Sequence, residues 1–230
     1  MFTLTEMVVD RLKMIKLVTL DFDGTTADTM PTLEEIAVKL ITKYYLLSQE
    51  EAKTKYRLTT GLPFLQQIEQ LFPGHPANNE VIQQFEEEKK NNIFSLPLFD
   101  DTKETIKSLK NMGFIVAISS STTQPTIEEY CRKKGLFVDQ ILGFREGFEK
   151  GKDHFDFLMK KFHLTTKEIL YVGDSLKDCE RAQAANILFI GKIGLFTKED
   201  FDRISQSKLV ITKLSELTEL LKTFREKENK

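Results

Sequence analysis

The feature of this sequence that most constrains its fold is a series of short apolar runs separated by amphipathic segments. Short continuous apolar runs are typical of strands that are buried on both faces, as in parallel sheets. The segments between them carry apolar residues at helical spacing. This alternation predicts an α/β protein with a doubly wound, Rossmann-like parallel sheet. The expected strands are residues 17–20, 114–118, 169–172 and 187–190, with 209–211 as a candidate fifth.

One long stretch interrupts this alternation. Residues 26–98 contain no run that reads as a strand, and apolar stripes at helical spacing occur there instead. We therefore expect a small all-helical domain at residues 26–98, inserted after the first strand of a core domain that comprises residues 1–25 and 99–230. The two connections, Thr26–Met30 and Ser95–Asp100, would lie side by side and act as a hinge.

Charge and composition exclude several classes of protein. The 33 basic and 35 acidic residues give a net charge of −2, without the basic excess of a nucleic-acid-binding protein. No apolar run approaches the ~20 residues of a membrane span, and Met1–Glu6 lacks the basic and apolar pattern of a secretory signal. Two cysteines, Cys131 and Cys179, are too few for a disulfide framework. We expect a cytoplasmic monomer that binds neither nucleic acid nor membranes.

Polar groups follow the expected strands at their carboxyl ends. Asp21-Phe22-Asp23-Gly24-Thr25 follows the first strand, Ser119-Ser120-Ser121 the second, and Gly173-Asp174-Ser175-Leu176-Lys177-Asp178 the third. Lys152 begins a helical pattern after Gly151. Ligands of open α/β sheets bind beyond the carboxyl ends of the strands, so the fold should gather these four groups in one place.

These groups together suit phosphoryl chemistry. Carboxylates in one small site repel one another unless a cation lies among them, and hard oxygen ligands suit Mg²⁺. A lysine and hydroxyl groups beside that cation suit the binding of a phosphate group. One carboxylate can attack such a phosphate to form an acyl phosphate. A second carboxylate nearby can protonate the leaving oxygen and later activate water.

Each group alone also has an ordinary structural interpretation. The DFDG segment fits a tight turn, Ser119 a cap, Lys152 a solvent-exposed lysine, and GDSLKD the start of a helix. Their order, at the ends of the predicted elements, favours the catalytic interpretation.

The same four groups resemble, in order, the four motifs of the haloacid dehalogenase (HAD) superfamily. The resemblance rests on DFDGT, the hydroxyl residue after FIVAI, Lys152 and YVGDSLKD, and it extends from about Lys16 to the last helical pattern. The helical insert resembles the cap domain of the phosphoglycolate phosphatase and β-phosphoglucomutase branch. The resemblance therefore implies a HAD-type α/β core with a helical cap.

The resemblance also implies a role for each motif residue. Asp21 would be the nucleophile and Asp23 the general acid and base. Ser119 and Ser120 would bind the phosphoryl oxygens, and Lys152 would neutralise them and position Asp21.

By the same resemblance the chain binds a metal cofactor, Mg²⁺. Its ligands would be Asp21, Asp174 and the backbone carbonyl of Asp23. Asp178 would support the metal site, either directly or through water.

The implied function is Mg²⁺-dependent hydrolysis of a small phosphorylated metabolite through an aspartyl-phosphate intermediate. A sugar-phosphate mutase is a first alternative, but such mutases keep a histidine in the hinge helix. Leu33 stands at the matching position, and no histidine lies between Asp21 and His75. A non-catalytic binding or regulatory protein of the same fold is a second alternative, although all four motif positions are filled.

The substrate depends on the cap. Thr59-Thr60-Gly61-Leu62-Pro63 resembles the cap loop that faces the active site in relatives. Lys53, Lys55 and Arg57 precede this loop, where they would either meet an anionic substrate or serve as ordinary surface charges.

Overall fold

A computed structural model describes residues 6–205 and 208–225 of the chain. Six parallel strands form one sheet in the order β3-β2-β1-β4-β5-β6, which confirms the predicted doubly wound α/β fold. The strands are β1 Leu17–Asp21, β2 Ile115–Thr123, β3 Gln140–Phe144, β4 Ile169–Gly173, β5 Leu188–Lys192 and β6 Val210–Ile211.

Helices cover both faces of this sheet because its strands alternate apolar side chains between the faces. Val18 and Leu20 of β1 join one core cluster, whereas Leu17 joins the other. The first cluster is closed by α1 Glu6–Met14, α6 Thr102–Asn111, α7 Gln124–Lys134 and α11 Ser215–Arg225. The second is closed by α8 Lys152–Phe162, α9 Leu176–Ala184 and α10 Lys198–Ile204, and a short 3-10 helix, Thr166–Glu168, precedes β4.

The sequence pattern missed one strand, β3, which lies at the edge of the sheet. Only Leu142 and Gly143 of this strand are buried, so it lacks the continuous apolar run that marks the other strands. Gly143 packs against α7 so closely that a Cβ atom there would lie 2.6 Å from Cα of Gln124.

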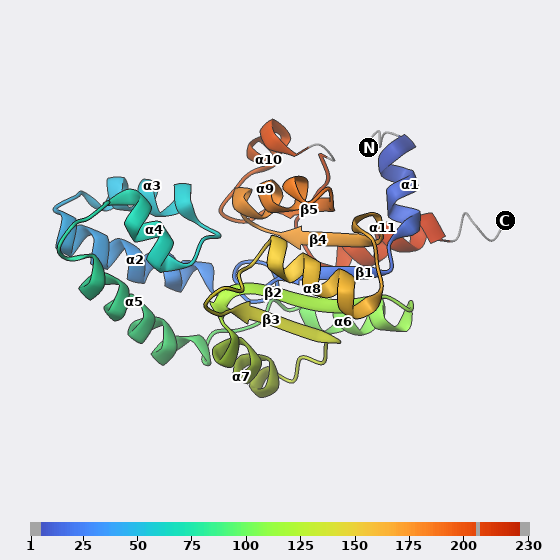
Figure 1. Ribbon diagram of the computed structural model, residues 1–230, viewed down its shortest axis with the longest axis horizontal. Helices are drawn as coiled ribbons and strands as arrows, with labels where there is room; N and C mark the ends of the chain where they lie inside the picture. The colour runs from blue at the N-terminus through green and yellow to red at the C-terminus, as the bar shows by residue number, and fades with distance from the viewer. Residues whose placement is uncertain (1–5, 206–207, 226–230) are drawn as a thin grey trace.

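Residues 30–93 form a helical block made of α2 Met30–Tyr45, α3 Gln49–Thr59, α4 Phe64–Leu71 and α5 Asn78–Ile93. These helices share a core of their own, to which Leu40, Tyr56 and Ile68 contribute. Figure 1 shows the block on the side of the sheet toward which the arrowhead of β4 points. The subdivision of the chain into two domains stays a prediction.

The two connections to the helical block lie side by side, as the sequence predicts. The backbone N–H of Asp28 donates to the carbonyl of Pro97 at 3.0 Å, and that of Phe99 donates to the carbonyl of Thr26 at 3.2 Å. These bonds bring both chain crossings to the carboxyl end of β1. Among the described helices, none is long and apolar enough to cross a membrane.

Candidate active site

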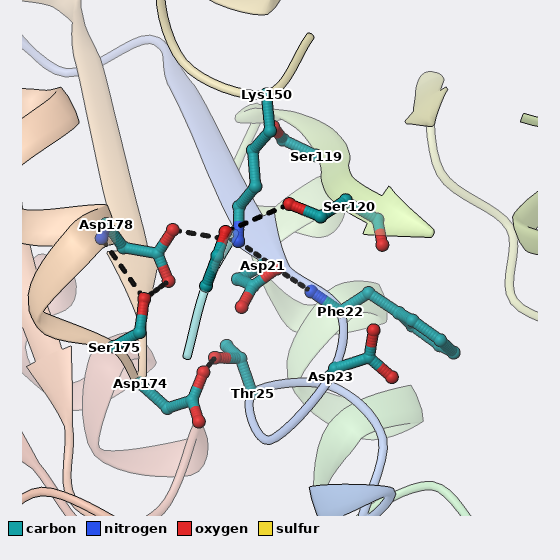
Figure 2. A network of polar contacts seen from close by, with 12 residues as sticks. Asp21, Phe22, Asp23, Thr25, Ser119, Ser120, Lys150, Asp174, Ser175 and Asp178 are labelled. Atoms are coloured by element: carbon teal, nitrogen blue, oxygen red, sulfur yellow. Dashed lines mark hydrogen bonds and ion pairs between the residues drawn. The ribbon is translucent and has the colours of Figure 1, made fainter. Parts of the chain in front are cut away.

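Three buried carboxylates meet at the carboxyl ends of the central strands (Figure 2). Asp21 is the last residue of β1, Asp174 follows β4, and Asp178 lies in the first turn of α9. Each offers an oxygen atom within 4.8 Å of the others, a spacing that can hold a divalent cation. The sequence correctly predicted that these residues come together.

Lys150 lies among these carboxylates. Its Nζ atom is 2.7 Å from Oδ1 of Asp21 and 2.8 Å from Oδ1 of Asp178, and its side chain is only 3 % exposed. It belongs to the loop before α8, and the loop lets the side chain point back to the strand ends. Lys150 thus takes the position that the sequence analysis gave to Lys152.

The prediction for Lys152 is wrong. Its side chain is 83 % exposed and pairs with Asp156 one helical turn further on. Lys152 is the first residue of α8 and faces solvent. The sequence segment Lys150-Gly151-Lys152 contains two candidate lysines, and only the position of the helix start distinguishes them.

The lysine determines how charge is distributed in the cluster. Burial raises the pKa of Asp21 well above its usual range, although Lys150 opposes this rise. Burial, with the charge of Asp178, raises the pKa of Asp174 to about 7. At Asp178 the effect of burial is outweighed by Lys150 and Arg181, so its pKa falls below its usual range. Burial lowers the pKa of Lys150, but Asp178 and Asp21 together raise it above its usual value.

Asp178 is held by several donors. The hydroxyl of Tyr171 donates to its Oδ1 at 2.8 Å, and that of Ser175 donates to its Oδ2 at 2.7 Å. Both oxygens are therefore engaged by the protein in addition to Lys150. In contrast, Asp174 accepts a longer bond, from the hydroxyl of Thr25 at 3.3 Å.

Gly24 allows the turn after β1 to run beside Asp174. Its φ angle is +77°, in the region that favours glycine. A Cβ atom there would lie 2.1 Å from Oδ2 of Asp174. The glycine of the DFDG segment is thus required by both the turn and the neighbouring carboxylate.

Asp23 lies nearer to the surface than Asp21, with a side chain that is 17 % exposed. The hydroxyl of Thr29 donates to its Oδ1 at 2.7 Å, and that of Thr122 donates to its Oδ2 at 2.9 Å. Lys89 of the helical block donates to Oγ1 of Thr122 at 2.8 Å and lies 3.6 Å from Oδ2 of Asp23. Asp23 is therefore fixed between a hinge residue, a strand end and the helical block.

The three serines at the end of β2 point to different places. Oγ of Ser119 lies 2.8 Å from Nδ1 of the buried His154, and Oγ of Ser120 accepts from the backbone N–H of Thr122 at 2.9 Å. Ser121 lines the cavity above the carboxylates. Ser119 and Ser120 lie beside the centre, as Figure 2 shows, but both hydroxyls already have partners within the protein.

The cavity lies between the core and the helical block. Asp21, Asp174 and Lys150 line its core side, and Thr60-Gly61-Leu62-Pro63-Phe64 lines the opposite side. The carbonyl of Gly61 accepts from Oγ of Ser121 at 3.0 Å and from Nη1 of Arg181 at 2.7 Å. The loop that the sequence singled out therefore faces the buried carboxylates and Lys150.

The three basic residues before that loop do not line the cavity. Lys53 and Arg57 both pair with Glu34, at 3.5 Å and 2.5 Å, and Nζ of Lys55 lies 5.8 Å from the centre of the Phe72 ring. The alternative interpretation, that they are ordinary surface charges, holds.

Fold and site together define a class of protein. The buried carboxylates and Lys150 lie beyond the carboxyl ends of a doubly wound sheet, which is where open α/β proteins bind their ligands. Residues 18–192 match the haloacid dehalogenase-like hydrolase family, and the chain belongs to this family.

Two curated relatives illustrate the branch. The phosphoglycolate phosphatase of Vibrio parahaemolyticus is 24% identical over 221 residues, which cover 90% of this chain and 96% of the relative. That of Haemophilus influenzae is 23% identical over 192 residues, covering 76% and 84%. These matches confirm the resemblance seen in the sequence and the assignment of the chain as a phosphatase.

Solved structures share the fold. A predicted phosphatase of Clostridium acetobutylicum superposes with a TM-score of 0.76 at 18% identity, covering 91% of this chain and 99% of that one. A variant of CbbY from Rhodobacter sphaeroides, bound to xylulose-(1,5)bisphosphate, superposes with a TM-score of 0.69 at 17% identity, covering 88% and 96%.

Separate replacement of the two lysines tests which of them serves the site. Lys150→Met should lower kcat/KM for a phosphate monoester by about 100-fold or more, the usual cost of removing one charge-stabilising donor. Lys152→Met should change kcat/KM by less than about twofold, because the Lys152 side chain faces solvent and substitutions of such residues usually have small effects. The measurement is steady-state turnover by each variant, with circular dichroism to confirm folding. Loss of activity in Lys152→Met alone would contradict the structural assignment.

Proposed function

We propose that the protein is a Mg²⁺-dependent phosphatase that hydrolyses a small phosphomonoester through an aspartyl phosphate on Asp21. The observation that carries the proposal is the position of Asp21. Its carboxylate ends β1, faces the cavity, and is held by Lys150 at 2.7 Å. A carboxylate so placed can attack a phosphate group that enters from the cavity.

The donor set fits Mg²⁺. The centre offers oxygen atoms only, which suit a hard cation, and burial together with the neighbouring carboxylates raises the pKa of both Asp21 and Asp174. Asp21 and Asp174, with the backbone carbonyl of Asp23, would bind Mg²⁺ directly. Because the oxygens of Asp178 already accept from Tyr171 and Ser175, we expect Asp178 to support the metal through water.

Each residue of the site has a part in the proposed reaction. Asp21 attacks phosphorus, the bond to the leaving oxygen breaks, and Asp23 donates a proton to that oxygen. Asp23 then takes a proton from the water that hydrolyses the aspartyl phosphate. Lys150 neutralises the phosphoryl oxygens and keeps Asp21 oriented. When bound, Mg²⁺ would supply further charge neutralisation.

We also propose that residues 26–98 act as the cap. The contacts of Gly61 with Ser121 and Arg181 support a closed position over the site. Closure would exclude water until the leaving group has gone. Leu33 lines the cavity where related mutases keep a histidine, which favours hydrolysis over the mutase alternative.

The nucleophile can be tested directly. Asp21→Asn should abolish turnover of 4-nitrophenyl phosphate in the presence of Mg²⁺, because an amide neither attacks phosphorus nor replaces the charge of the carboxylate. Mass spectrometry of rapidly quenched wild-type protein should show a phosphate adduct on Asp21. Retention of a tenth of wild-type activity by Asp21→Asn would rule out the covalent route.

The proton donor has a distinct signature. Asp23→Asn should slow hydrolysis of an alkyl phosphate by roughly 10²–10⁴-fold, the usual contribution of a general acid or base. The loss should be smaller for an aryl phosphate, whose leaving oxygen needs no proton. Equal losses for the two esters would mean that Asp23 acts only as a structural residue.

Metal binding should depend on pH. With a pKa of about 7 in the metal-free protein, Asp174 is protonated below that pH, and Mg²⁺ must displace the proton. Isothermal titration calorimetry should therefore show a Kd that falls at least about tenfold per pH unit as pH rises toward about 7, because the raised pKa of Asp21 adds to the effect.

The same pKa makes a prediction about stability. Because it lies above the ordinary value of 3.8, folding takes up a proton between these values, and the metal-free protein should lose stability as pH rises from about 4 to about 7. Asp174→Asn should remove this contribution. If neither the Mg²⁺ affinity nor the stability difference between wild type and Asp174→Asn changes with pH, Asp174 is ionised over the whole range.

A further inference from the structure

The helical block presents an apolar wall to the cavity. Its wall includes Met30 and Leu33 of α2, Leu62 of the loop before α4, and the rings of Phe64 and Phe85. The two rings are stacked with their centres 3.6 Å apart, so they form a firm surface. The leaving group of a substrate would therefore meet apolar side chains.

Two polar residues in that wall, Thr60 and Gln67, already have partners within the helical block. Oγ1 of Thr60 donates to the carbonyl of Tyr56 at 3.1 Å. The amide of Gln67 accepts from Thr59 at 3.1 Å and donates to the carbonyl of Leu62 at 2.9 Å. These groups offer little to a polar substrate, since binding would require them to give up an existing bond.

The helical block contributes one positive and one negative side chain to the cavity, and their charges balance. Lys89 and Glu86 of α5 both line the cavity and carry opposite charges. The ammonium of Lys89 is already engaged by Thr122 and Asp23 and is largely buried. A second negative group on the substrate would find no uncommitted cation there and would face Glu86. A positive group would displace or repel Lys89.

One neutral polar group remains. The side chain of Tyr56 lines the cavity, and its hydroxyl has no hydrogen-bond partner among the residues that the structure describes. The free volume of the cavity is about 50 Å³, a few times the ~10–15 Å³ that a single water requires on this measure. The helical block leaves little enclosed space above the carboxylates, which favours a short leaving group.

We propose that the preferred substrate is a phosphate ester of a short, uncharged and largely apolar alcohol, with at most one oxygen placed to meet Tyr56. This inference rests on the proposed phosphatase function and narrows its substrate class. It separates the chain from the relatives named phosphoglycolate phosphatase, whose named substrate carries a carboxylate. The cavity would select among phosphate esters through its apolar wall and its balanced charges. It offers no free cation that would attract a second negative group.

Three esters of similar size test the proposal. Propyl phosphate is uncharged beyond its phosphate, 2-phosphoglycolate adds a carboxylate, and phosphoethanolamine adds an ammonium group. With wild-type protein and Mg²⁺, kcat/KM should be at least about tenfold higher for propyl phosphate than for either charged ester, equivalent to about 1.4 kcal/mol. An equal or higher value for either charged ester would overturn the proposal.

A charge reversal with a matched control tests whether the charges of the cavity lining cause this preference. Glu86→Lys should raise the ratio of kcat/KM for 2-phosphoglycolate to that for propyl phosphate by about fivefold, because it adds a free cation at the cavity. Glu87→Lys makes the same change at the next residue, which is exposed as Glu86 is but lies outside the cavity lining, and it should alter the ratio by less than about twofold. Equal effects of the two variants would overturn the argument from the cavity lining.

Failure of the proposed function and failure of the proposed substrate class would give different results. If the wild-type protein hydrolyses none of these esters and no 4-nitrophenyl phosphate, the proposed function itself is wrong. If it hydrolyses 4-nitrophenyl phosphate but prefers 2-phosphoglycolate, the phosphatase function stands and only the substrate class is wrong.

Discussion

The ammonium of Lys150 between Asp21 and Asp178 is the interaction on which the site depends. Three carboxylates buried within 4.8 Å of one another are costly to desolvate and repel each other. Lys150 compensates part of that charge, and Tyr171 and Ser175 fix Asp178 as its anchor. The uncompensated charge then falls on Asp21 and Asp174, the two groups that face the cavity. In the proposed reaction, a cation bound by Asp21 and Asp174 would compensate this charge beside the phosphate group.

The parallel sheet makes this concentration of charge possible. The register of β1 sets Asp21 beside Ser119 of β2, and the alternation of side chains directs Asp21 to the same face as α8 and α9. Asp178 and Lys150 reach the centre from α9 and from the loop before α8. Each of these elements is anchored in one of two large apolar cores, which hold the charged centre in place.

Sequence reasoning succeeded where a residue's position follows from the strand that bears it. Asp21 and Asp174 end apolar runs, so the sheet alone brings them together. It failed for Lys150, because a lysine in a loop reaches the site only if the following helix starts after it, and patterns locate helix starts to within a residue or two. It also missed β3, whose Gly143 serves a close contact with α7. The pairing of Lys53 and Arg57 with Glu34 is a tertiary contact that spacing does not reveal.

The core and the helical block contribute to the site in opposite ways. The core supplies charge at fixed points, which any phosphate ester would use equally. The block supplies an apolar wall and polar groups that are satisfied among themselves. A surface of that kind discriminates mainly by exclusion, because a charged leaving group would lose its hydration without gaining a partner. Under the proposed function, chemistry and selectivity would rest on different parts of the chain, which meet where Thr29 donates to Asp23 and at the carbonyl of Gly61.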